Sequence, residues 1–231
     1  MPIMTIIVSK DSGKFKKIES TNFALEVNLQ EKIHEGEIMK KIKLGPDEDL
    51  TLLTLAREFS TTSGPIDVIA IGAEGDIYII ETKLKKNSDR REILAQIIDY
   101  GATFWSYRKD FEDFERKVNA WLKKERNTSL NDELEQFGED RFEDLKEKIE
   151  DNFSNSRFKF VIVMDEVDDK TKNIVNFLTE NSEFTIILVE FKHYNHNGYD
   201  ITVPELYGHE IEKTKRSTQR KHYDWDRQGL F

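Results

Sequence analysis

One segment constrains the fold of this chain more than any other: two apolar runs, residues 66–71 and 77–84, joined by Gly72-Ala-Glu-Gly-Asp76. The runs IDVIAI and IYIIETKL have the length and the Ile and Val content of strands. A short glycine-containing connection between such runs predicts an antiparallel hairpin. With residues 72–76 as the loop, Asp67 lies directly opposite Glu81. The sequence therefore predicts a strand pair that brings two carboxylates together.

The remaining pattern alternates strands with helices, which indicates an α/β protein with a central mixed β-sheet flanked by helices. Before the hairpin we expect a helix that starts at Thr21 or Asn22 and stops at Gly36, and then a strand over 50–59 with a loop at 60–64. After the hairpin we expect a helix over 89–108 capped by Asn87 or Ser88, followed by two amphipathic helices between 110 and 151. The last expected elements are strands over 158–164 and 184–194 around a helix over 169–180, and a strand over 199–203 that Pro204 ends. We expect a core that includes Leu53, Val68, Ile80, Ile97, Phe160, Ile162 and Leu188.

The chain reads as one domain with additions at both ends. Residues 1–20, with apolar or charged runs at 3–8 and 14–18 around a turn, predict an N-terminal hairpin. Residues 21–210 form the single domain, which carries a charged helical insertion at about 110–152. Residues 211–231 are a basic C-terminal tail. Acidity is concentrated in residues 131–151, which hold ten acids and three bases.

Composition excludes several classes of protein. The net charge of −10 excludes a generally polycationic nucleic-acid binder. The absence of cysteine excludes disulfide scaffolds, thiolate nucleophiles and thiolate-bound metals. The apolar run at residues 3–8 is too short for a signal peptide or a membrane span, so we expect a cytoplasmic protein without a membrane partner.

The chemistry of the chain is expected at the end of the hairpin. The two-residue period of a strand puts Glu81 and Lys83 on one face and turns Thr82 the other way. Two carboxylates opposite each other repel unless a hard cation such as Mg²⁺ or Mn²⁺ neutralises them, and Asp67, Glu81 and the backbone carbonyl of Thr82 would suffice as ligands. Lys83 would then orient a water or stabilise a charged transition state. This set suits phosphodiester hydrolysis.

At this point the sequence resembles the PD-(D/E)xK nuclease superfamily, through Pro65-Ile66-Asp67 and Glu81-Thr82-Lys83. Gln96 and Tyr100, as QxxxY, look like the motif of RecB-like members. Arg57-Glu58-Phe59 looks like the branch of archaeal-type single-strand and mismatch endonucleases. The resemblance covers roughly residues 22–107.

The resemblance implies a restriction-endonuclease-like core and an Mg²⁺- or Mn²⁺-dependent endo- or exodeoxyribonuclease in DNA repair or in defence against foreign DNA. It implies Asp67, Glu81 and Lys83 as catalytic residues. It adds two metal ligands: Glu58, and a glutamate of the first helix, for which Glu26 is the best match and Glu31 the alternative.

DNA contacts are expected from a basic stretch at residues 83–91, where five bases stand against the one acid Asp89. The contacting residues would be Lys85, Lys86, Arg90 and Arg91, together with Gln96 and Tyr100 near the active site. A different interpretation makes the basic stretch a solvated loop and makes Gln96 and Tyr100 packing residues of a helix.

A second functional class stays open. A non-catalytic nucleic-acid or protein-binding module would keep the nuclease fold and dock a protein partner through the acidic 131–151 helix. The intact trio of Asp67, Glu81 and Lys83 favours the enzyme, because a degenerate module has no need of all three. Strand preference, RNA instead of DNA, and a homodimer are also left open by the sequence.

Overall fold

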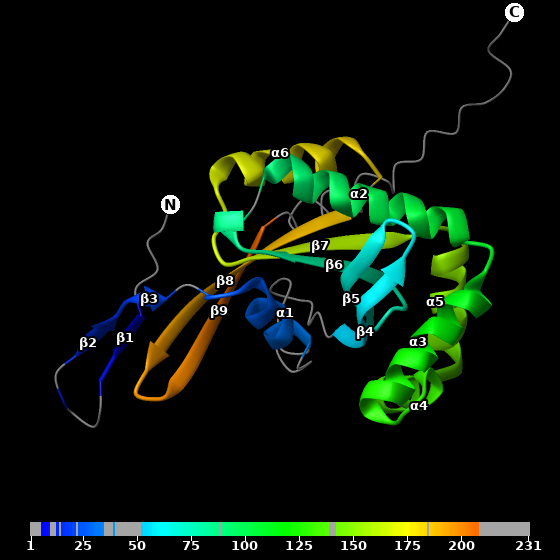
Figure 1. Ribbon diagram of the computed structural model, residues 1–231, viewed down its shortest axis with the longest axis horizontal. Helices are drawn as coiled ribbons and strands as arrows, with labels where there is room; N and C mark the ends of the chain where they lie inside the picture. The colour runs from blue at the N-terminus through cyan, green and yellow to red at the C-terminus, as the bar shows by residue number, and fades with distance from the viewer. Residues whose placement is uncertain are drawn as a thin grey trace, which may run out of the picture.

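The computed structural model describes residues 6–9, 13, 15–21, 23–34, 39, 52–87, 89–138, 142–183 and 185–207. Over these residues the chain is an α/β protein with a central seven-stranded mixed sheet (Figure 1). The expected basic tail at 211–231 lies outside the described residues, as do residues 1–5, Asn22, Gly36 and Ser88. No helix in the described part of the chain is long and apolar enough to cross a membrane.

The sheet combines an antiparallel half with a parallel half. The antiparallel half is a meander of three consecutive strands, and β7 and β8 continue the sheet parallel to the last of them. The strands are β4 (Leu52–Thr61), β5 (Gly64–Gly72), β6 (Ile77–Lys83), β7 (Phe158–Met164) and β8 (Thr185–His196), with β9 (Tyr199–Tyr207) and the short β3 (Ser20–Thr21) both antiparallel to β8. Residues of the expected N-terminal hairpin form a separate antiparallel pair, β1 (Ile6–Val8) and β2 (Lys16–Ile18).

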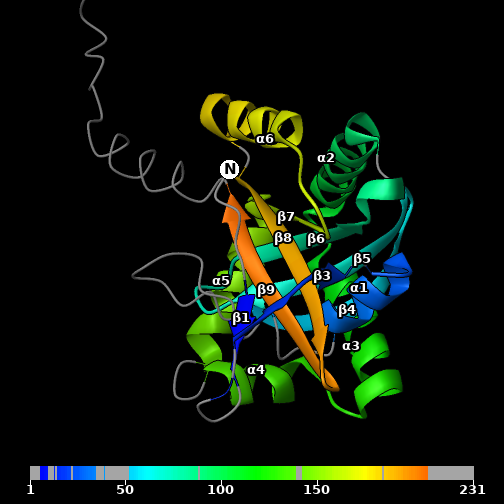
Figure 2. The ribbon, with the colours of Figure 1, turned by 90° about the vertical axis from the view of Figure 1, so that its left-hand side faces the viewer.

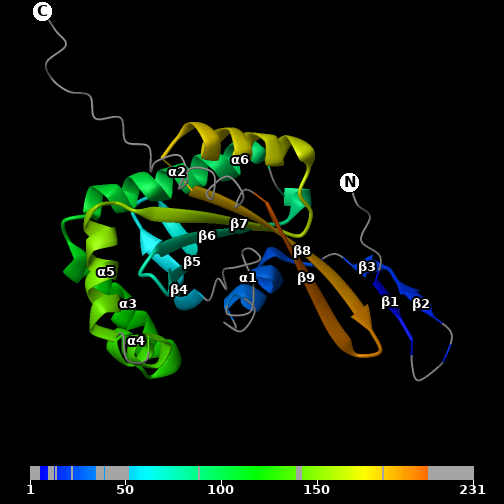
Figure 3. The same cartoon turned by 180° about the vertical axis from the view of Figure 1, so that it is seen from behind.

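Helices cover both faces of the sheet. Figure 2 shows α2 (Arg90–Tyr107) and α6 (Asp169–Asn181) on one side, and Figure 3 shows α1 (Glu26–His34) on the other. The short 3-10 helix η1 (Lys85–Asn87) joins β6 to α2. The charged insertion lies beside β4 (Figure 1) and consists of α3 (Phe111–Arg126), α4 (Leu130–Gly138) and α5 (Phe142–Ser154).

Burial on both faces explains why the central strands read as almost continuous apolar runs. All seven residues expected in the core are buried. They divide between two clusters: Leu53, Ile97, Phe160, Ile162 and Leu188 pack with α2, whereas Val68 and Ile80 pack with α1 on the opposite face. Full burial of one such side chain contributes about 1.5–3 kcal/mol.

The strand register of the hairpin is confirmed. Val68 pairs with Ile80, and the register continues through Ile71 opposite Ile77. The Val68 pair is the last in this ladder, so Asp67 lies one residue beyond it. The sheet therefore opens between β5 and β6 at the residues expected to carry the chemistry.

Two expected boundaries on the first half of the chain are wrong. The first helix begins at Glu26 and not at Thr21, because Thr21 belongs to β3 and pairs with His193. The Leu25 N–H donates to Asn28 Oδ1 at 3.1 Å, so an asparagine inside the first turn caps this helix. Strand β4 runs on to Thr61, past the expected loop start, and turns into β5 at Gly64, whose φ of 107° suits glycine.

Two further corrections concern α2 and β9. Asp89 caps α2, in place of Asn87 or Ser88, and its Oδ1 accepts from the Arg91 N–H at 2.9 Å. Strand β9 continues through Pro204, which pairs with Phe191. Proline is tolerated there because β9 pairs only with β8 among the described strands, and an edge strand has N–H groups that need no partner.

The insertion forms three helices and not two, so the acidic stretch at 131–151 is not one helix. Asn127, in the left-handed region at φ 54°, ends α3, and the predicted second helix is divided into α4 and α5. These helices are part of the core: Phe114 of α3 and Phe153 of α5 have ring centroids 4.9 Å apart, and both rings lie near Phe104 of α2. The aromatic content of the charged helices therefore serves packing.

Candidate active site

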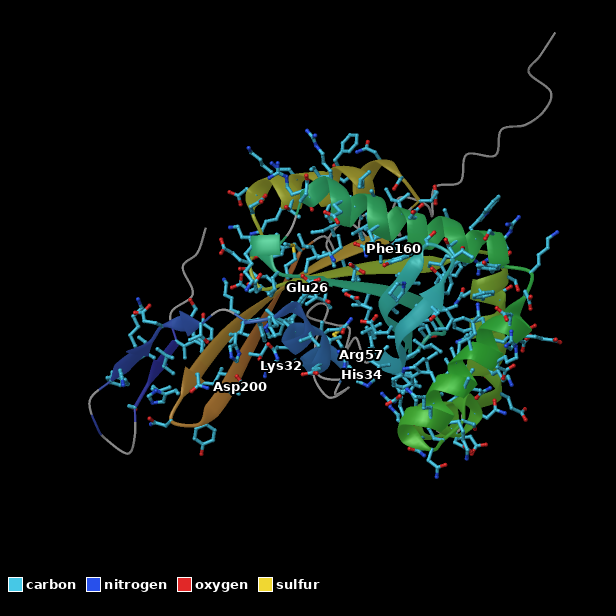
Figure 4. The ribbon with its side chains drawn as sticks, viewed as in Figure 1. Glu26, Lys32, His34, Arg57, Phe160 and Asp200 are labelled. Carbon is cyan, nitrogen blue, oxygen red and sulfur yellow. The ribbon has the colours of Figure 1, made fainter. Side chains whose placement is uncertain are left out.

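Asp67, Glu81 and Lys83 come together where β5 and β6 separate, and the first residue of α1 joins them. The Lys83 ammonium Nζ lies 3.2 Å from Glu81 Oε1 and 3.2 Å from Glu26 Oε1. Figure 4 shows Glu26 at the end of α1 nearest to β6. Glu26 Oε2 also accepts from the Leu84 N–H at 3.3 Å, so this glutamate binds both the lysine and the end of the strand.

The Glu81 carboxyl group is the most unusual group of the site. Its side chain is 0% exposed, and neither carboxyl oxygen accepts a hydrogen bond. The Lys83 ammonium, 3.2 Å from Oε1, is the ionic partner of this carboxyl group. Burial, and next the Asp67 carboxylate, raise the pKa of Glu81 to about 8, although Lys83 acts to lower it. Without a cation, Glu81 is therefore mainly protonated at pH 7.

The Asp67 carboxylate, in contrast, is held by the protein on both oxygens. Oδ2 accepts from the Thr82 N–H at 2.7 Å and from the Thr82 hydroxyl at 2.5 Å. Oδ1 accepts from Gln30 Nε2 at 2.9 Å. Burial raises the pKa of Asp67, and the two hydrogen bonds from Thr82 oppose that rise. The contribution of Thr82 in the structure is thus to fix Asp67 through its amide and hydroxyl.

The sequence reasoning missed Gln30. This residue of α1 is 6% exposed, and its Nε2 also donates to Glu58 Oε1 at 2.7 Å. Its Oε1 accepts from Arg57 Nε at 3.0 Å and from Arg57 Nη2 at 2.7 Å; Arg57 is marked in Figure 4. One signal was available: Gln30 stands one helical turn after Glu26, so both share a face of the helix.

The additional metal ligands expected from the resemblance have other contacts. Glu58 bonds to Gln30 and is exposed, and Glu26 bonds to Lys83 and Leu84. Glu31, the alternative to Glu26, is exposed on α1. Among the described residues, no group of three or more His, Asp or Glu side chains is arranged to hold a metal ion. Asp67 and Glu81 are the two carboxylates that remain to be considered: the Asp67 charge acts to raise the pKa of Glu81, and the Asp67 carboxylate itself is bonded to Thr82.

Gln96, which is half-buried, and the buried Tyr100 bond to each other. The Tyr100 hydroxyl donates to the Pro65 carbonyl at 2.7 Å and accepts from Gln96 Nε2 at 2.7 Å. Tyr100 is 2% exposed, and burial raises its pKa to about 12. Tyr100 therefore links α2 to β5 two residues before Asp67, and the DNA contact expected of this pair stays a prediction.

The basic stretch is partly neutralised by acids of the loop between β7 and α6. Lys85 forms an ion pair with Glu166, and its N–H donates to Asp165 Oδ1 at 2.7 Å. Arg90 lies 3.5 Å from Asp168. The other two bases differ: Lys86 is exposed and donates to the Ala24 carbonyl at 2.7 Å, and the Arg91 side chain is exposed.

Comparisons with known proteins identified no relative of this chain. No model of a protein family, no curated protein and no solved structure matches the chain. The arguments about function therefore depend on the arrangement of the chain's own residues.

Proposed function

We propose that this protein is a metal-dependent nuclease with a restriction-endonuclease-like core, which hydrolyses phosphodiester bonds of DNA in repair or in defence against foreign DNA. One observation carries the proposal: the Glu81 carboxyl is completely buried, has the Lys83 ammonium at 3.2 Å as its ionic partner, and has its pKa raised further by the Asp67 carboxylate. A buried carboxyl whose hydrogen-bonding capacity is not filled costs free energy, about 1–3 kcal/mol or more when it is charged. A cation bound between Glu81 and Asp67 would remove that cost.

The two carboxylates fit Mg²⁺ or Mn²⁺. Magnesium is commonly held by one or two protein carboxylates and keeps several waters, so the pair is a sufficient donor set. Glu81 offers both oxygens, and each Asp67 oxygen keeps accepting capacity beyond its bonds to Thr82 and Gln30. The bound metal would polarise a phosphate oxygen and make a water more acidic.

Lys83 is suited to act as a permanent cation. Burial acts to lower its pKa, but Glu81 and Glu26 outweigh burial and raise it to about 12. Lys83 therefore stays protonated at neutral pH and cannot serve as a general base. Its three N–H donors suit it to orient the attacking water or to stabilise charge on the phosphate in the transition state.

The order of elements also supports the proposal. A helix, three antiparallel strands, a second helix and a parallel strand follow each other as α1, β4, β5, β6, α2 and β7. The order places Asp67 and Glu81 on neighbouring strands and Tyr100 on the helix that follows. In this arrangement Lys86 and Arg91 are the exposed bases closest in sequence to the site, and we assign backbone phosphate contacts to them first.

A cleavage assay tests the proposal. The purified chain is incubated with supercoiled, linear duplex, single-stranded and mismatched DNA in Mg²⁺, Mn²⁺ or EDTA. We expect cleavage of at least one substrate with either metal and none in EDTA. Asp67→Asn should abolish it, whereas Asp144→Asn, the same change at an exposed position of α5, should not. Absence of cleavage under every metal condition would refute the proposal.

The second candidate, a non-catalytic binding module, is favoured by one observation. Lys85 and Arg90 are paired with Glu166 and Asp168, which reduces the positive charge available for phosphates. In that case the acidic helices α4 and α5 would bind a basic protein partner. DNA binding without cleavage, or no DNA binding in the same assay, would favour this function.

A further inference from the structure

Every polar atom of the Gln30 side chain is used. Both N–H groups of Nε2 donate to carboxylates, one to Glu58 Oε1 at 2.7 Å and one to Asp67 Oδ1 at 2.9 Å. Oε1 accepts two hydrogen bonds from the Arg57 guanidinium, at 2.7 and 3.0 Å. A buried amide with all four hydrogen bonds made is a strong constraint on its neighbours.

The direction of this amide follows from the chemistry of its partners. A guanidinium only donates and a carboxylate only accepts, so the oxygen of Gln30 has to face Arg57 and the nitrogen has to face Glu58 and Asp67. A reversed amide would place N–H groups against the guanidinium and an oxygen between two carboxylates. Arg57 thereby fixes the orientation in which Gln30 reaches Asp67.

The backbone around Asp67 is paired on one side only. Strand β4 pairs with Val68 and Ile66, on either side of Asp67, whereas the described β5–β6 ladder ends at Val68. Thr82 holds Oδ2 and Gln30 holds Oδ1, so the two contacts together fix the rotation of the carboxylate. Glu58, the other carboxylate on Gln30, has a φ of 50°, an uncommon conformation for a glutamate. Strained residues of this kind cluster at functional sites.

We propose that Gln30 is a positioning residue: it links α1 to β4 and β5 and fixes the Asp67 carboxylate in the orientation needed to bind the metal. A neutral amide suits this task, because it donates to two carboxylates without cancelling the negative charge that attracts a cation. A lysine would neutralise Asp67, and a glutamate would repel it. The part of the inference that concerns the metal rests on the proposed nuclease function.

An exchange of two residues separates positioning from simple stabilisation. Gln30→Glu replaces the donor to Asp67 by a like charge, and we expect cleavage to fall by about 10²-fold and Mn²⁺ affinity by about 10-fold. In the double variant Gln30→Glu/Glu58→Gln, the new amide at position 58 can donate to the new carboxylate at position 30. That carboxylate also still accepts from Arg57. Asp67 still lacks its donor in this variant. The urea unfolding midpoint should return toward that of the wild type while cleavage stays low.

The matched control is Gln136→Glu, the same change at an exposed position of α4, which should alter neither quantity. Recovery of full cleavage in the double variant would overturn the positioning role, because it would show that only the link between positions 30 and 58 matters. Full cleavage by Gln30→Glu alone would overturn it as well.

A measurement without metal or DNA distinguishes failure of this inference from failure of the nuclease proposal. In a ¹⁵N spectrum, the two side-chain N–H protons of Gln30 should be separately resolved. Asp67→Asn should shift one of them and Glu58→Gln the other. If neither variant shifts them, the positioning inference is overturned. If both shifts occur but the wild type cleaves no DNA, the contact is established and the nuclease proposal alone is refuted.

Discussion

Two strands of the sheet carry the same Glu-x-Lys triplet, and the structure treats them differently. Glu81-Thr82-Lys83 lies on β6 and Glu190-Phe191-Lys192 on β8, and both strands pair in parallel with β7. Both glutamates are buried, and each has a second carboxylate near it: Asp67 for Glu81, and Glu205 directly opposite Glu190. By sequence pattern and burial the two triplets are alike.

The difference lies in the donors that surround the acids. The single hydroxyl proton of Tyr207 is shared between Glu190 Oε2 and Glu205 Oε2, at 3.1 and 2.8 Å, and Lys192 donates to Glu205 Oε1 at 2.7 Å. Burial acts to raise the pKa of Glu205, but these bonds from Lys192 and Tyr207 lower it below its ordinary value. The Lys83 ammonium acts to lower the pKa of Glu81 as well, but burial and the Asp67 carboxylate outweigh it and raise this pKa to about 8. A Glu-x-Lys triplet is therefore a candidate site only where the protein leaves its carboxyl unsatisfied.

The largest expected effect comes from removing each glutamate in turn. Glu81→Gln should abolish cleavage and most divalent-metal affinity, because it removes one of the two carboxylates proposed to bind the metal. Glu190→Gln should leave both unchanged, since Glu190 is satisfied by Tyr207. A nicking assay and a calorimetric Mn²⁺ titration measure the two quantities. Equal loss in both variants would remove the distinction between the triplets.

Removing the lysine of each triplet should have a smaller effect: on the cleavage rate for Lys83, and on stability for Lys192. Lys83→Ala deletes a cation that acts on the water or the transition state but is not a ligand, so we expect the rate to fall by about 10²-fold while Mn²⁺ still binds. Lys192→Ala should keep the rate and lower the free energy of unfolding by about 1 kcal/mol, because Glu205 loses a partly exposed ion pair. Urea unfolding checks the second value, and loss of Mn²⁺ binding in Lys83→Ala would contradict the assignment.

The pH dependence of stability should reveal Glu81 directly. Its folded pKa of about 8 lies above its ordinary value of 4.5, so the folded state binds more protons than the unfolded state between these two values. The contribution of Glu81 to the free energy of unfolding of the metal-free protein should therefore be fully present below pH 4.5. It should be lost as pH rises to about 8, and the loss is on the order of a few kcal/mol.

Urea unfolding from pH 5 to pH 8.5 without metal measures this slope. Glu81→Gln should flatten it, and Glu190→Gln should not. Added Mn²⁺ should offset the loss at the high end of the range, because metal binding favours the deprotonated carboxylate. A slope that is the same in Glu81→Gln and in the wild type would show that other groups cause it.

The smallest effect concerns the bases outside the site. Lys86→Ala with Arg91→Ala should weaken DNA binding equally for all sequences and reduce the salt slope of log affinity by about two. Lys85→Ala should reduce it by less, because Lys85 is already paired with Glu166. DNA binding at several salt concentrations tests both. An unchanged slope in the double variant would place the phosphate contacts elsewhere.

Features that depend on local periodicity could be predicted from the amino-acid sequence. Alternation of residues and the length of the loop predicted the register of β5 and β6, which holds from Ile71 opposite Ile77 to Val68 opposite Ile80. The same alternation identified the strands of the core and the helix that carries Tyr100. Two element boundaries in the first half of the chain were predicted wrongly, because Thr21 pairs with β8 as part of β3 and because the turn at 62–63 lies later than the run of Ser and Thr suggested.

The packing of distant elements settles which partner each polar group has. Gln30 reaches Asp67 across 37 positions, and Lys85 meets Glu166 across 81. Glu190 shares the Tyr207 hydroxyl, whereas Glu81 has the Lys83 ammonium at ion-pair distance and accepts no hydrogen bond from another group of the described residues. Contacts between distant elements have no period in the sequence, and burial sets the pKa of a carboxyl only once those elements have packed. For this reason two triplets with the same Glu-x-Lys pattern have different surroundings: Glu190 lies in a cluster with Lys192, Glu205 and Tyr207, and Glu81 lies in the candidate metal site.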